Sequence, residues 1–453
     1  MNGKLKTELT PNREQRVLAH FAEVRRKKSP RRGVKTENGK LYSAFLNSAG
    51  VTTDSRKIEV GALFFALHGA SFDGNDYALQ ALEQGASAAV IDREDILNNN
   101  PQYAERLLLV EDTLQALQAL AQEHRRRLAI PIVAIAGSNG KTTTKELVSR
   151  VLAEKFEVST TRGNLNNHIG VPLTLLSMTT ETEFGVVEMG ASAQGEIALL
   201  CSIAEPNYGI LTNIGLSHLE GFGGVEGIRK GKGELFDHLN ENGGRAFVPQ
   251  EDEVLCEMAA AREDLAVEYY SRTIGEGFRS NLTGDYNRYN IAAAVKVGRY
   301  FGVTDERIAE AILSFTPDNN RSQAVKTERN RLVVDCYNAN PSSMEVALDN
   351  IATTEAEYKV LILGDMLELG EWSEEAHRTI LRKADTIAER IILVGNEFTK
   401  AFVAVGEELQ ADYTLYPTTA EAVAALENSP ISDSLILLKG SRGIKLEQLI
   451  EKL

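Results

Sequence analysis

Residues 134–147, AIAGSNGKTTTKEL, carry the pattern that decides the fold. The run just before it, residues 130–136, is short, apolar and rich in branched side chains, which is typical of a buried parallel strand. After it, Leu147 and Val151 belong to an apolar stripe at helical spacing. We therefore expect a strand, a tight turn at residues 137–140 and a helix. In that arrangement backbone N–H groups and the helix N-terminus can all face one anion.

The turn matches a phosphate-binding loop only in part. Its Gly-Lys-Thr end fits the pattern G-x-x-x-x-G-K-[ST], but the position five before Gly140 is Ile135. Lys141 adds a positive charge, and the hydroxyl of Thr142 can ligate Mg²⁺. The alternative is an ordinary glycine-rich turn before a capped helix. The pattern favours a site for nucleotide phosphates, without indicating which reaction follows.

The composition is that of a globular protein with several domains. A chain of 453 residues is too long for one ordinary core, and its 43% hydrophobic and 25% charged residues are usual for a globular protein. The apolar runs are far shorter than the ~20 residues that span a membrane, and no signal peptide is evident. The three cysteines are odd in number and unclustered, which favours a reducing, cytoplasmic location.

The charge is unevenly distributed along the chain. Residues 1–40 contain 12 Lys or Arg and 4 Asp or Glu, whereas the whole chain has a net charge of −15. An acidic body disfavours nonspecific binding to nucleic acid. The basic arm is either a solvated tail or a segment that touches an anionic surface. We expect the arm to be a solvated tail, and we expect the protein to have no nucleic acid partner.

Alternation of strand and helix patterns divides the rest of the chain into three blocks. We expect an α/β fold with a small N-terminal α/β domain, a central phosphate-loop domain and a second doubly wound domain at the C-terminus. The sheets of the last two should be mainly parallel. With the arm, the expected boundaries are 1–40, 41–125, 126–316 and 317–453.

Polar residues that follow the buried strands are the candidates for chemistry, because ligands sit at the carboxyl ends of parallel strands. Glu188 ends VVEMG and could hold magnesium, or could be a strand-end acid in solvent. His218 follows the next strand and is a second candidate, although a lone histidine is more often structural. We expect both at the same edge of the sheet.

Two further pairs of polar residues have suggestive spacing. Lys230 and Lys232 stand two residues apart before an expected helix, where positive charge opposes the helix dipole. Asn287 and Asn290 are three apart at the start of an Ala-rich helix, so both carboxamides can read one purine edge. Capping of the helix by Asn287 is an equally good explanation.

Eight motifs occur in a fixed order along the chain: GSNGKTTTKE, EMGAS, TNIGLSHLEGF, KGE, YNRYN, DCYNANPSSM, GDMLELG and LLKGSRG. Together they resemble the Mur ligases of peptidoglycan synthesis, and the resemblance runs from about residue 41 to the end. It implies a uridine-nucleotide domain, a central ATPase and a C-terminal Rossmann-like domain. YNANP and GDMLELG favour the member that joins D-alanyl-D-alanine to UDP-N-acetylmuramoyl-tripeptide.

The resemblance implies ATP-driven amide formation with Mg²⁺. A carboxylate of the muramoyl peptide attacks the γ-phosphate to give an acyl phosphate, and the dipeptide amine then displaces phosphate. Two anions must meet, so positioning and electrostatic stabilisation should dominate. No nucleophilic protein residue is needed, because both nucleophiles belong to substrates.

The resemblance also implies a role for individual residues. The expected nucleotide contacts are Gly137, Ser138, Asn139, Gly140, Lys141, Thr142, Thr143, Asn287, Asn290, Arg321 and Asp335. The expected catalytic groups are Lys141, Glu188, His218, Lys232 and Arg321. The expected metal ligands are Thr142, Glu188, His218 and Lys232 as a carbamate. Asp54, Ser55 and Arg56 resemble the uridine-nucleotide loop, and Asn164, Asn166 and Asn167 the loop that presents the muramoyl peptide.

Three positions depart from the family pattern. Tyr286 stands where a histidine is common, Asn320 where a glycine precedes the arginine, and Asn75 where the family has DGH. None of them removes an expected catalytic group, but Asn320 weakens the assignment of Arg321.

Other functions remain as alternatives. The nearest are a Mur-type ligase that adds the third peptide residue and folylpolyglutamate synthetase, both disfavoured by NANP and GDMLELG. A phosphate-loop switch would normally show an N-K-x-D guanine motif. A scaffold that uses ATP only structurally does not need Lys141, Thr142 and Glu188 together. We expect a monomeric enzyme without a membrane span.

Overall fold

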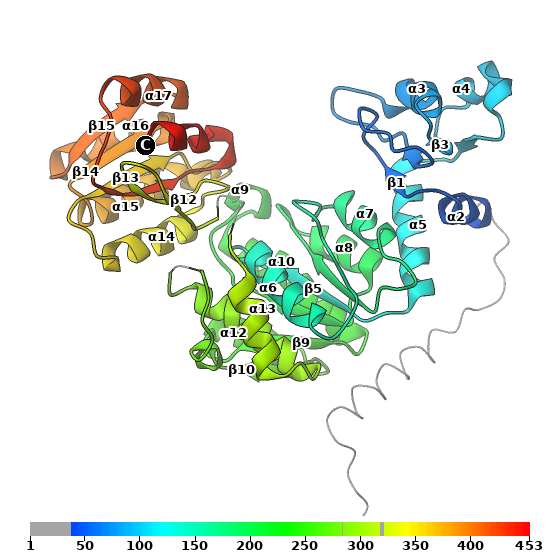
Figure 1. Cartoon of the computed structure of the whole chain (residues 1–453), viewed down its shortest axis with the longest axis horizontal. Coiled ribbons are helices and arrows are strands. Elements are labelled where there is room, and N and C mark those ends of the chain that lie inside the picture. Colours follow the sequence, from blue (N-terminus) through cyan, green and yellow to red (C-terminus); the bar gives the residue numbers. More distant parts are fainter. Residues whose placement is uncertain (1–37, 283, 318–320) are drawn as a thin grey trace, which may run out of the picture.

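Three sheets, each with its own helices, form successive units of the chain (Figure 1). The strands within each sheet are all or mainly parallel. The structure is a computed structural model that describes residues 38–282, 284–317 and 321–453. Most of the basic arm and Asn320 lie outside these residues. The α/β class expected from the sequence is confirmed.

The N-terminal unit has a four-stranded parallel sheet in the order β1-β2-β3-β4. Its strands are β1 (Val51–Thr52), β2 (Leu63–Phe65), β3 (Ala88–Ile91) and β4 (Leu107–Leu109). Its helices are α2 (Asn38–Leu46), α3 (Ala78–Glu83), α4 (Glu94–Asn99) and α5 (Thr113–Leu128). Helix α5 extends from this unit to α7 and α8 of the next, so the expected boundary after residue 125 lies within a continuous helix (Figure 1).

The central unit has a six-stranded parallel sheet in the order β10-β9-β8-β5-β7-β6. Its strands are β5 (Ile132–Ala136), β6 (Val158–Thr160), β7 (Phe184–Glu188), β8 (Tyr208–Leu211), β9 (Arg245–Pro249) and β10 (Ala266–Tyr270). Its helices are α6 (Lys141–Ala153), α7 (Gly170–Leu176), α8 (Glu196–Ala204), α9 (Leu219–Phe222), α10 (Val225–Glu241), α11 (Glu253–Ala260), α12 (Asn287–Tyr300) and α13 (Asp305–Ser314).

Strand β5 lies between β7 and β8, and this order determines where the polar residues meet. All five residues of β5 are buried, as expected for a strand covered on both faces. The chain then turns into α6, whose Leu147 and Val151 are fully buried, as the sequence predicted. Because parallel strands end at the same edge, the segments that follow β5, β7 and β8 lie side by side.

The C-terminal unit has a six-stranded sheet in the order β11-β12-β16-β13-β14-β15, in which only β11 is antiparallel to its neighbour. Its strands are β11 (Gln323–Lys326), β12 (Arg331–Asp335), β13 (Lys359–Gly364), β14 (Arg390–Val394), β15 (Asp412–Tyr416) and β16 (Leu435–Lys439). Its helices are α14 (Pro341–Thr353), α15 (Ser373–Asp385), α16 (Asn396–Val405) and α17 (Thr419–Asn428).

One local expectation and one alternative explanation are wrong. Lys230 and Lys232 do not precede a helix, because α10 begins at Val225 and already includes them. Gly224, in an extended left-handed conformation, allows this earlier start. Asn287 is not the N-cap of α12, since Tyr286 occupies that position.

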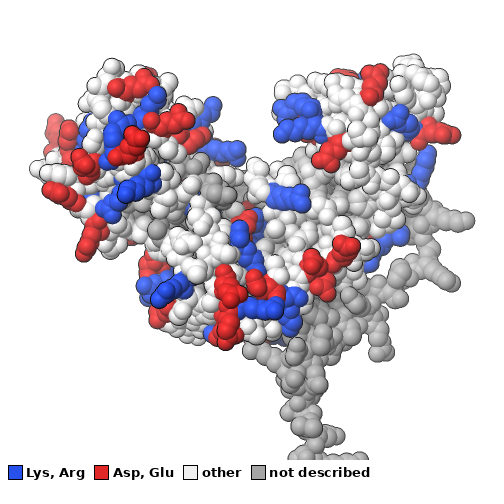
Figure 2. Space-filling model, in the orientation of Figure 1, with Lys and Arg blue, Asp and Glu red and all other residues white. Residues whose placement is uncertain are grey.

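The surface carries charged side chains of both signs. On the face that Figure 2 shows, Lys and Arg side chains are interspersed with Asp and Glu over all three units. Among the described residues, no helix combines the length and the apolar character needed to cross a membrane.

Candidate active site

The phosphate loop is held by the segment that follows β8. The hydroxyl of Ser138 donates to the carbonyl of Gly215 (2.8 Å), and the N–H of Gly215 donates to Ser138 Oγ (2.9 Å). The N–H groups of Ser138 and Asn139 donate to Asn213 (both 3.1 Å). Thr212 Oγ1 donates to the carbonyl of Asn139 (2.6 Å). Two strand ends therefore fix the shape of the loop.

The N–H groups of Ser138 and Asn139 are thus engaged by Asn213, so not every N–H of the turn faces an anion. The donors that remain are those of the first turn of α6, which have no intrahelical partner. Gly140 is the N-cap, at φ +78°, and offers no side chain to cap that turn. The start of α6 is therefore where a phosphate would bind.

Lys141 lies across the phosphate loop. Its Nζ donates to the carbonyls of Gly137 (2.9 Å) and Ser138 (3.0 Å). Burial lowers the pKa of Lys141 to about 8, Glu188 opposes this shift, and Arg321 adds to it. Lys141 therefore interacts electrostatically with both Glu188 and Arg321, although Glu188 ends β7 and Arg321 lies at the start of the C-terminal unit.

Two buried oxygens near the loop have no hydrogen-bond partner among the described residues. They are Thr142 Oγ1 and Glu188 Oε2. The other carboxylate oxygen of Glu188 accepts from Asn166 Nδ2 (2.8 Å), and only 1% of the Glu188 residue surface is exposed. The reading of Glu188 as a solvated acid is therefore wrong. Buried oxygens without donors are costly, and a hydroxyl with a carboxylate is a donor set suited to Mg²⁺.

A cavity of about 1100 Å³ opens above the phosphate loop, between the central and C-terminal units. Predicted site residues that line it are Ser138, Asn139, Gly140, Lys141, Thr143, Asn166, Asn167, Glu188, His218, Asn290, Arg321 and Asp335. Its size is that of sites for substrate-sized ligands. The structure therefore brings together predicted residues from β7, α6, α12, β12 and the segments that follow β5, β6 and β8.

Asn287 and Asn290 bond to each other at the start of α12. Asn290 Nδ2 donates to Asn287 Oδ1 (2.8 Å), and Asn290 Oδ1 accepts from the hydroxyl of Thr144 on α6 (3.0 Å). Both residues are buried, and only Asn290 belongs to the cavity lining. The pair joins α12 to α6 behind the phosphate loop, and its predicted role toward adenine stays a prediction.

His218 and Lys232 lie close to the loop but are held differently. His218 Nδ1 donates to a carboxylate oxygen of Glu368, a residue of the C-terminal unit. Lys232 is 1% exposed and lies behind the cavity wall, where its Nζ donates to the carbonyl of Ala191 (2.9 Å). Burial lowers the pKa of Lys232 well below its usual range, and the charge of Lys141 lowers it further.

The C-terminal unit contributes an arginine that is supported by an aromatic ring. Cζ of Arg321 lies 3.7 Å from the ring centroid of Tyr337, in a cation–π contact. Arg321 Nε is buried without a hydrogen-bond partner among the described residues. Asp335, the predicted ribose ligand, accepts from Lys439 Nζ (2.6 Å) and from the N–H of Ser322 (3.2 Å).

The N-terminus of α14 docks directly on the phosphate loop. Asn340 caps that helix and its Nδ2 donates to Asn139 Oδ1 (2.9 Å). Ser342 Oγ accepts from the N–H of Leu216 (2.9 Å). Sequence reasoning missed Tyr337, Asn340, Glu368 and Lys439 as site residues. The only sequence signal for them was that they lie in the motifs DCYNANPSSM, GDMLELG and LLKGSRG.

The predicted substrate loops are placed apart from one another. Asn166 and Asn167 line the cavity, but Asn167 Oδ1 also accepts from the N–H of Gly170 at the start of α7 (2.9 Å). Asp54 and Arg56 lie on the N-terminal unit, outside the cavity lining, where they form a two-bond ion pair (2.8 and 2.9 Å). That pair lowers the pKa of Asp54 to about 2.

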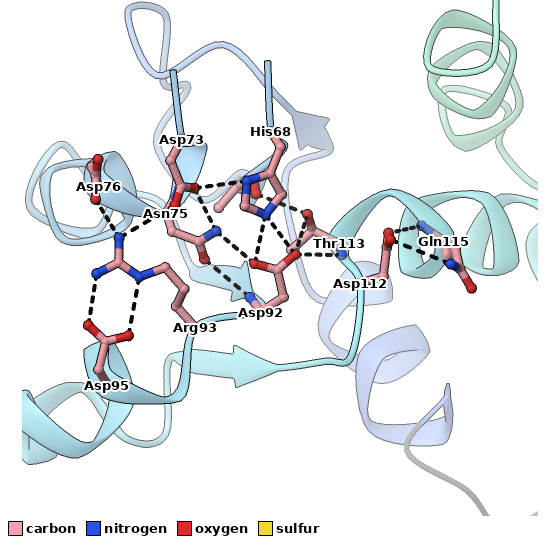
Figure 3. A network of polar contacts seen from close by, with 11 residues as sticks. His68, Asp73, Asn75, Asp76, Asp92, Arg93, Asp95, Asp112, Thr113 and Gln115 are labelled. Atoms are coloured by element: carbon pink, nitrogen blue, oxygen red, sulfur yellow. Dashed lines mark hydrogen bonds and ion pairs between the residues drawn. The ribbon is translucent and has the colours of Figure 1, made fainter. Parts of the chain in front are cut away.

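Asn75 is the centre of a polar network in the N-terminal unit (Figure 3). Its Nδ2 donates to Asp73 and to Asp92 (both 2.8 Å), and its Oδ1 accepts from the N–H of Asp92 (3.1 Å). His68 also contacts Asp92, whose carboxylate raises the pKa of the imidazole. The departure from DGH therefore leaves a satisfied amide that joins the loop at residue 73 to the end of β3.

The fold and the cavity define an α/β protein with a phosphate loop enclosed by a second α/β unit. Residues 47–125 match the Mur ligase family catalytic domain, 135–277 the Mur ligase middle domain and 320–442 the Mur ligase glutamate ligase domain. The chain belongs to the Mur ligase family, whose members use ATP.

Relatives over almost the whole chain carry one name, UDP-N-acetylmuramoyl-tripeptide–D-alanyl-D-alanine ligase. The protein of that name in Bacillus subtilis (strain 168) is 35% identical over 431 residues, which are 89% of this chain and 93% of the relative. That of Escherichia coli (strain K12) is 34% identical over 92% of this chain and 96% of its own length.

Solved structures agree. MurF from Acinetobacter baumannii superimposes with a TM-score of 0.79 at 30% identity, covering 92% of this chain and 98% of its own. MurF from Thermotoga maritima in complex with ADP gives 0.76 at 26% identity, over 90% and 97%. Folylpolyglutamate synthase from Mycobacterium tuberculosis shares only the fold, at 13% identity and a TM-score of 0.59 over 75% of this chain and 94% of its own.

A methyl group at residue 137 tests the geometry of the loop. A Cβ on Gly137, which has φ +130°, would lie 2.2 Å from Thr212 Oγ1 and 2.9 Å from the Thr212 nitrogen. We expect Gly137→Ala to displace the loop and weaken ADP binding by roughly tenfold or more, since small misplacements at such sites are costly. Calorimetric titration with ADP measures this.

Gly243→Ala is the matched control. Gly243 also has a positive φ, +66°, but its Cβ would enter open space. It should bind ADP as the unaltered chain does. Equal affinity in both variants would contradict the loop geometry described above.

Proposed function

We propose that this chain joins D-alanyl-D-alanine to the carboxylate of UDP-N-acetylmuramoyl-tripeptide with hydrolysis of ATP to ADP, in the synthesis of peptidoglycan precursors. The observation that carries the proposal is the cavity in which the phosphate loop faces the C-terminal motif NANP and Lys439 of the motif LLKGSRG. The relatives named for this reaction, and the MurF structure with ADP, support it.

The residues around the cavity suit transfer of the γ-phosphoryl group to a carboxylate. The first turn of α6 and Lys141 bind the phosphates, and Arg321, held on Tyr337, reaches the terminal phosphate from the C-terminal unit. The peptide carboxylate becomes an acyl phosphate, and the dipeptide amine then displaces phosphate to form the amide. Enclosure between two units excludes water, which would hydrolyse the acyl phosphate.

Mg²⁺ fits the donor set of the site. Thr142 and Glu188 each present a buried side-chain oxygen that has no hydrogen-bond partner in the described part of the chain. Glu188, His218 and a carbamate of Lys232 would hold a second ion. Within residues 38–282, 284–317 and 321–453 no three His, Cys, Asp or Glu side chains lie close enough together to form a metal site. The proposed second site contains only two such residues, Glu188 and His218, and its third ligand would be the carbamate of Lys232. Bound metal would neutralise charge on the phosphates.

We place the uridine nucleotide on the N-terminal unit at Asp54, Ser55 and Arg56, and the muramoyl peptide at Asn164, Asn166 and Asn167. Asn287 and Asn290 would face adenine, and Asp335 would hold the ribose. We retain the division into units 41–125, 126–316 and 317–453 with a separate basic arm. A monomer in the cytoplasm completes the proposal.

Product analysis tests the reaction. Purified protein with ATP, Mg²⁺, UDP-muramoyl-tripeptide and D-alanyl-D-alanine should give ADP, phosphate and a pentapeptide product in equal amounts. UDP-muramoyl-dipeptide with lysine or diaminopimelate is the control for a ligase that adds the third residue, and should give no amide. Release of ADP without a new amide, or amide only in the control, rejects the proposal.

Lys232 is suited to become a carbamate. Reaction with carbon dioxide needs a neutral amine, and burial together with Lys141 lowers the pKa of Lys232 in that direction. The alternative is that Lys232 stays an ammonium ion and pairs with Glu234 or with a substrate phosphate. The carboxylate of Glu234 instead accepts from the N–H groups of Gly195 (2.6 Å) and Ala198 (2.8 Å) at the start of α8.

Chemical rescue tests the carbamate. Lys232→Ala should lose activity at least tenfold and recover part of it with short-chain carboxylic acids, which fill the space and supply an anion. Lys230→Ala is the control, because Lys230 is exposed on the same helix and should be nearly fully active. Near-normal activity of Lys232→Ala, or rescue of the Lys230 variant instead, contradicts the assignment.

A further inference from the structure

The contact between His218 and Glu368 joins two units of the chain through two unusual backbone positions. His218 follows β8, and Glu368 lies between β13 and α15. Both are non-glycine residues in the left-handed region, with φ +53° and +64°. Such conformations are uncommon, and they persist where surrounding structure enforces them, often at functional sites. The surrounding structure therefore holds both residues in conformations that allow this contact between the units.

The loop that carries Glu368 is fixed on both sides. The N–H of Met366 donates to His377 Nε2 (3.0 Å), and that of Leu367 donates to Ser441 Oγ (2.9 Å). Further along the loop, a Cβ on Gly370 would lie 3.2 Å from Glu220 of α9. These contacts hold the loop against the segment around α9, with Glu368 at the point of contact.

The chemistry of the contact determines the state of the imidazole. A carboxylate can only accept a hydrogen bond, so Nδ1 of His218 must carry the proton. In the neutral ring the lone pair is then on Nε2. Histidines that bind metals commonly donate their other N–H to a carboxylate, which fixes the tautomer and the ring orientation.

We propose that Glu368 is a positioning residue of the metal site: through Nδ1 of His218 it leaves Nε2 free to ligate the ion. The site is then complete only when the C-terminal unit is docked. This inference rests on the proposed metal role of His218. Glu368 is not among the residues that line the cavity, and in this proposal it acts through the histidine alone.

Affinity for Mn²⁺, measured by electron paramagnetic resonance in the presence of ADP on the full chain, tests the proposal without turnover. Glu368→Ala should weaken the binding of Mn²⁺ about tenfold or more, the usual effect of losing a carboxylate behind a metal-bound histidine. Glu368→Gln should stay within about threefold of the unaltered chain, because its amide oxygen still accepts from Nδ1. Glu371→Ala, which removes an exposed charge from the same loop, should change nothing.

His218→Ala gives the reference for the loss of the ligand itself. The double variant with Glu368→Ala should bind Mn²⁺ no more weakly than His218→Ala alone, because both changes remove one interaction. If His218→Ala weakens the binding and Glu368→Ala does not, this inference fails while the metal role of His218 stands. If His218→Ala has no effect, both fail. Equal losses in the Gln and Ala variants would make Glu368 a direct ligand and overturn the positioning role.

Trp372, the single tryptophan of the chain, reports whether the loop stays docked. Its ring would lie 3.5 Å from a Cβ on Gly224, across the same interface. Its fluorescence should be unchanged in Glu368→Ala, because Met366 and Leu367 still hold the loop. A shift in emission that accompanies the loss of Mn²⁺ would make Glu368 a clamp between the units, which also overturns the proposal.

Discussion

A carboxylate and a triphosphate repel each other, and the site must offset this repulsion before a bond can form. At ~4 Å, two unit charges of the same sign repel by about 4 kcal/mol at an effective dielectric constant of ~20. The site offsets this repulsion with the positive charges of Lys141 and Arg321, the N–H groups of the first turn of α6 and two oxygens suited to Mg²⁺. The groups of the central unit depend on β5 lying between β7 and β8, because that order brings the three strand ends together.

The cationic site is divided between two units. The central unit supplies Lys141, and the C-terminal unit supplies Arg321 and the cap residue Asn340, which bonds to Asn139 of the phosphate loop. A site assembled from two units can admit large substrates when they separate and exclude water when they meet. This is consistent with polar contacts between the units at the phosphate loop and at the segment that holds His218.

Much of this was predictable from the sequence where local pattern and fold agree. The run at 130–136 and the turn at 137–140 gave the strand, loop and helix because burial and glycine geometry are local properties. Glu188 and His218 were found because parallel strands end at one edge. Lys230 and Lys232 were placed outside their helix because Gly224, rather than a conventional capping residue, precedes its start. Contacts such as Asn139 with Asn340 join residues 201 positions apart, and no local pattern encodes them.

Isotope transfer tests the central claim, that the peptide carboxylate attacks the γ-phosphate in this cavity. The reaction is run with UDP-muramoyl-tripeptide whose reacting carboxylate carries two ¹⁸O atoms, and the phosphate released is read by ³¹P nuclear magnetic resonance. Attack by the carboxylate followed by loss of phosphate predicts one ¹⁸O in each phosphate and one retained in the amide carbonyl. Phosphate without ¹⁸O, formed at the same rate as the amide, would contradict an acyl-phosphate route.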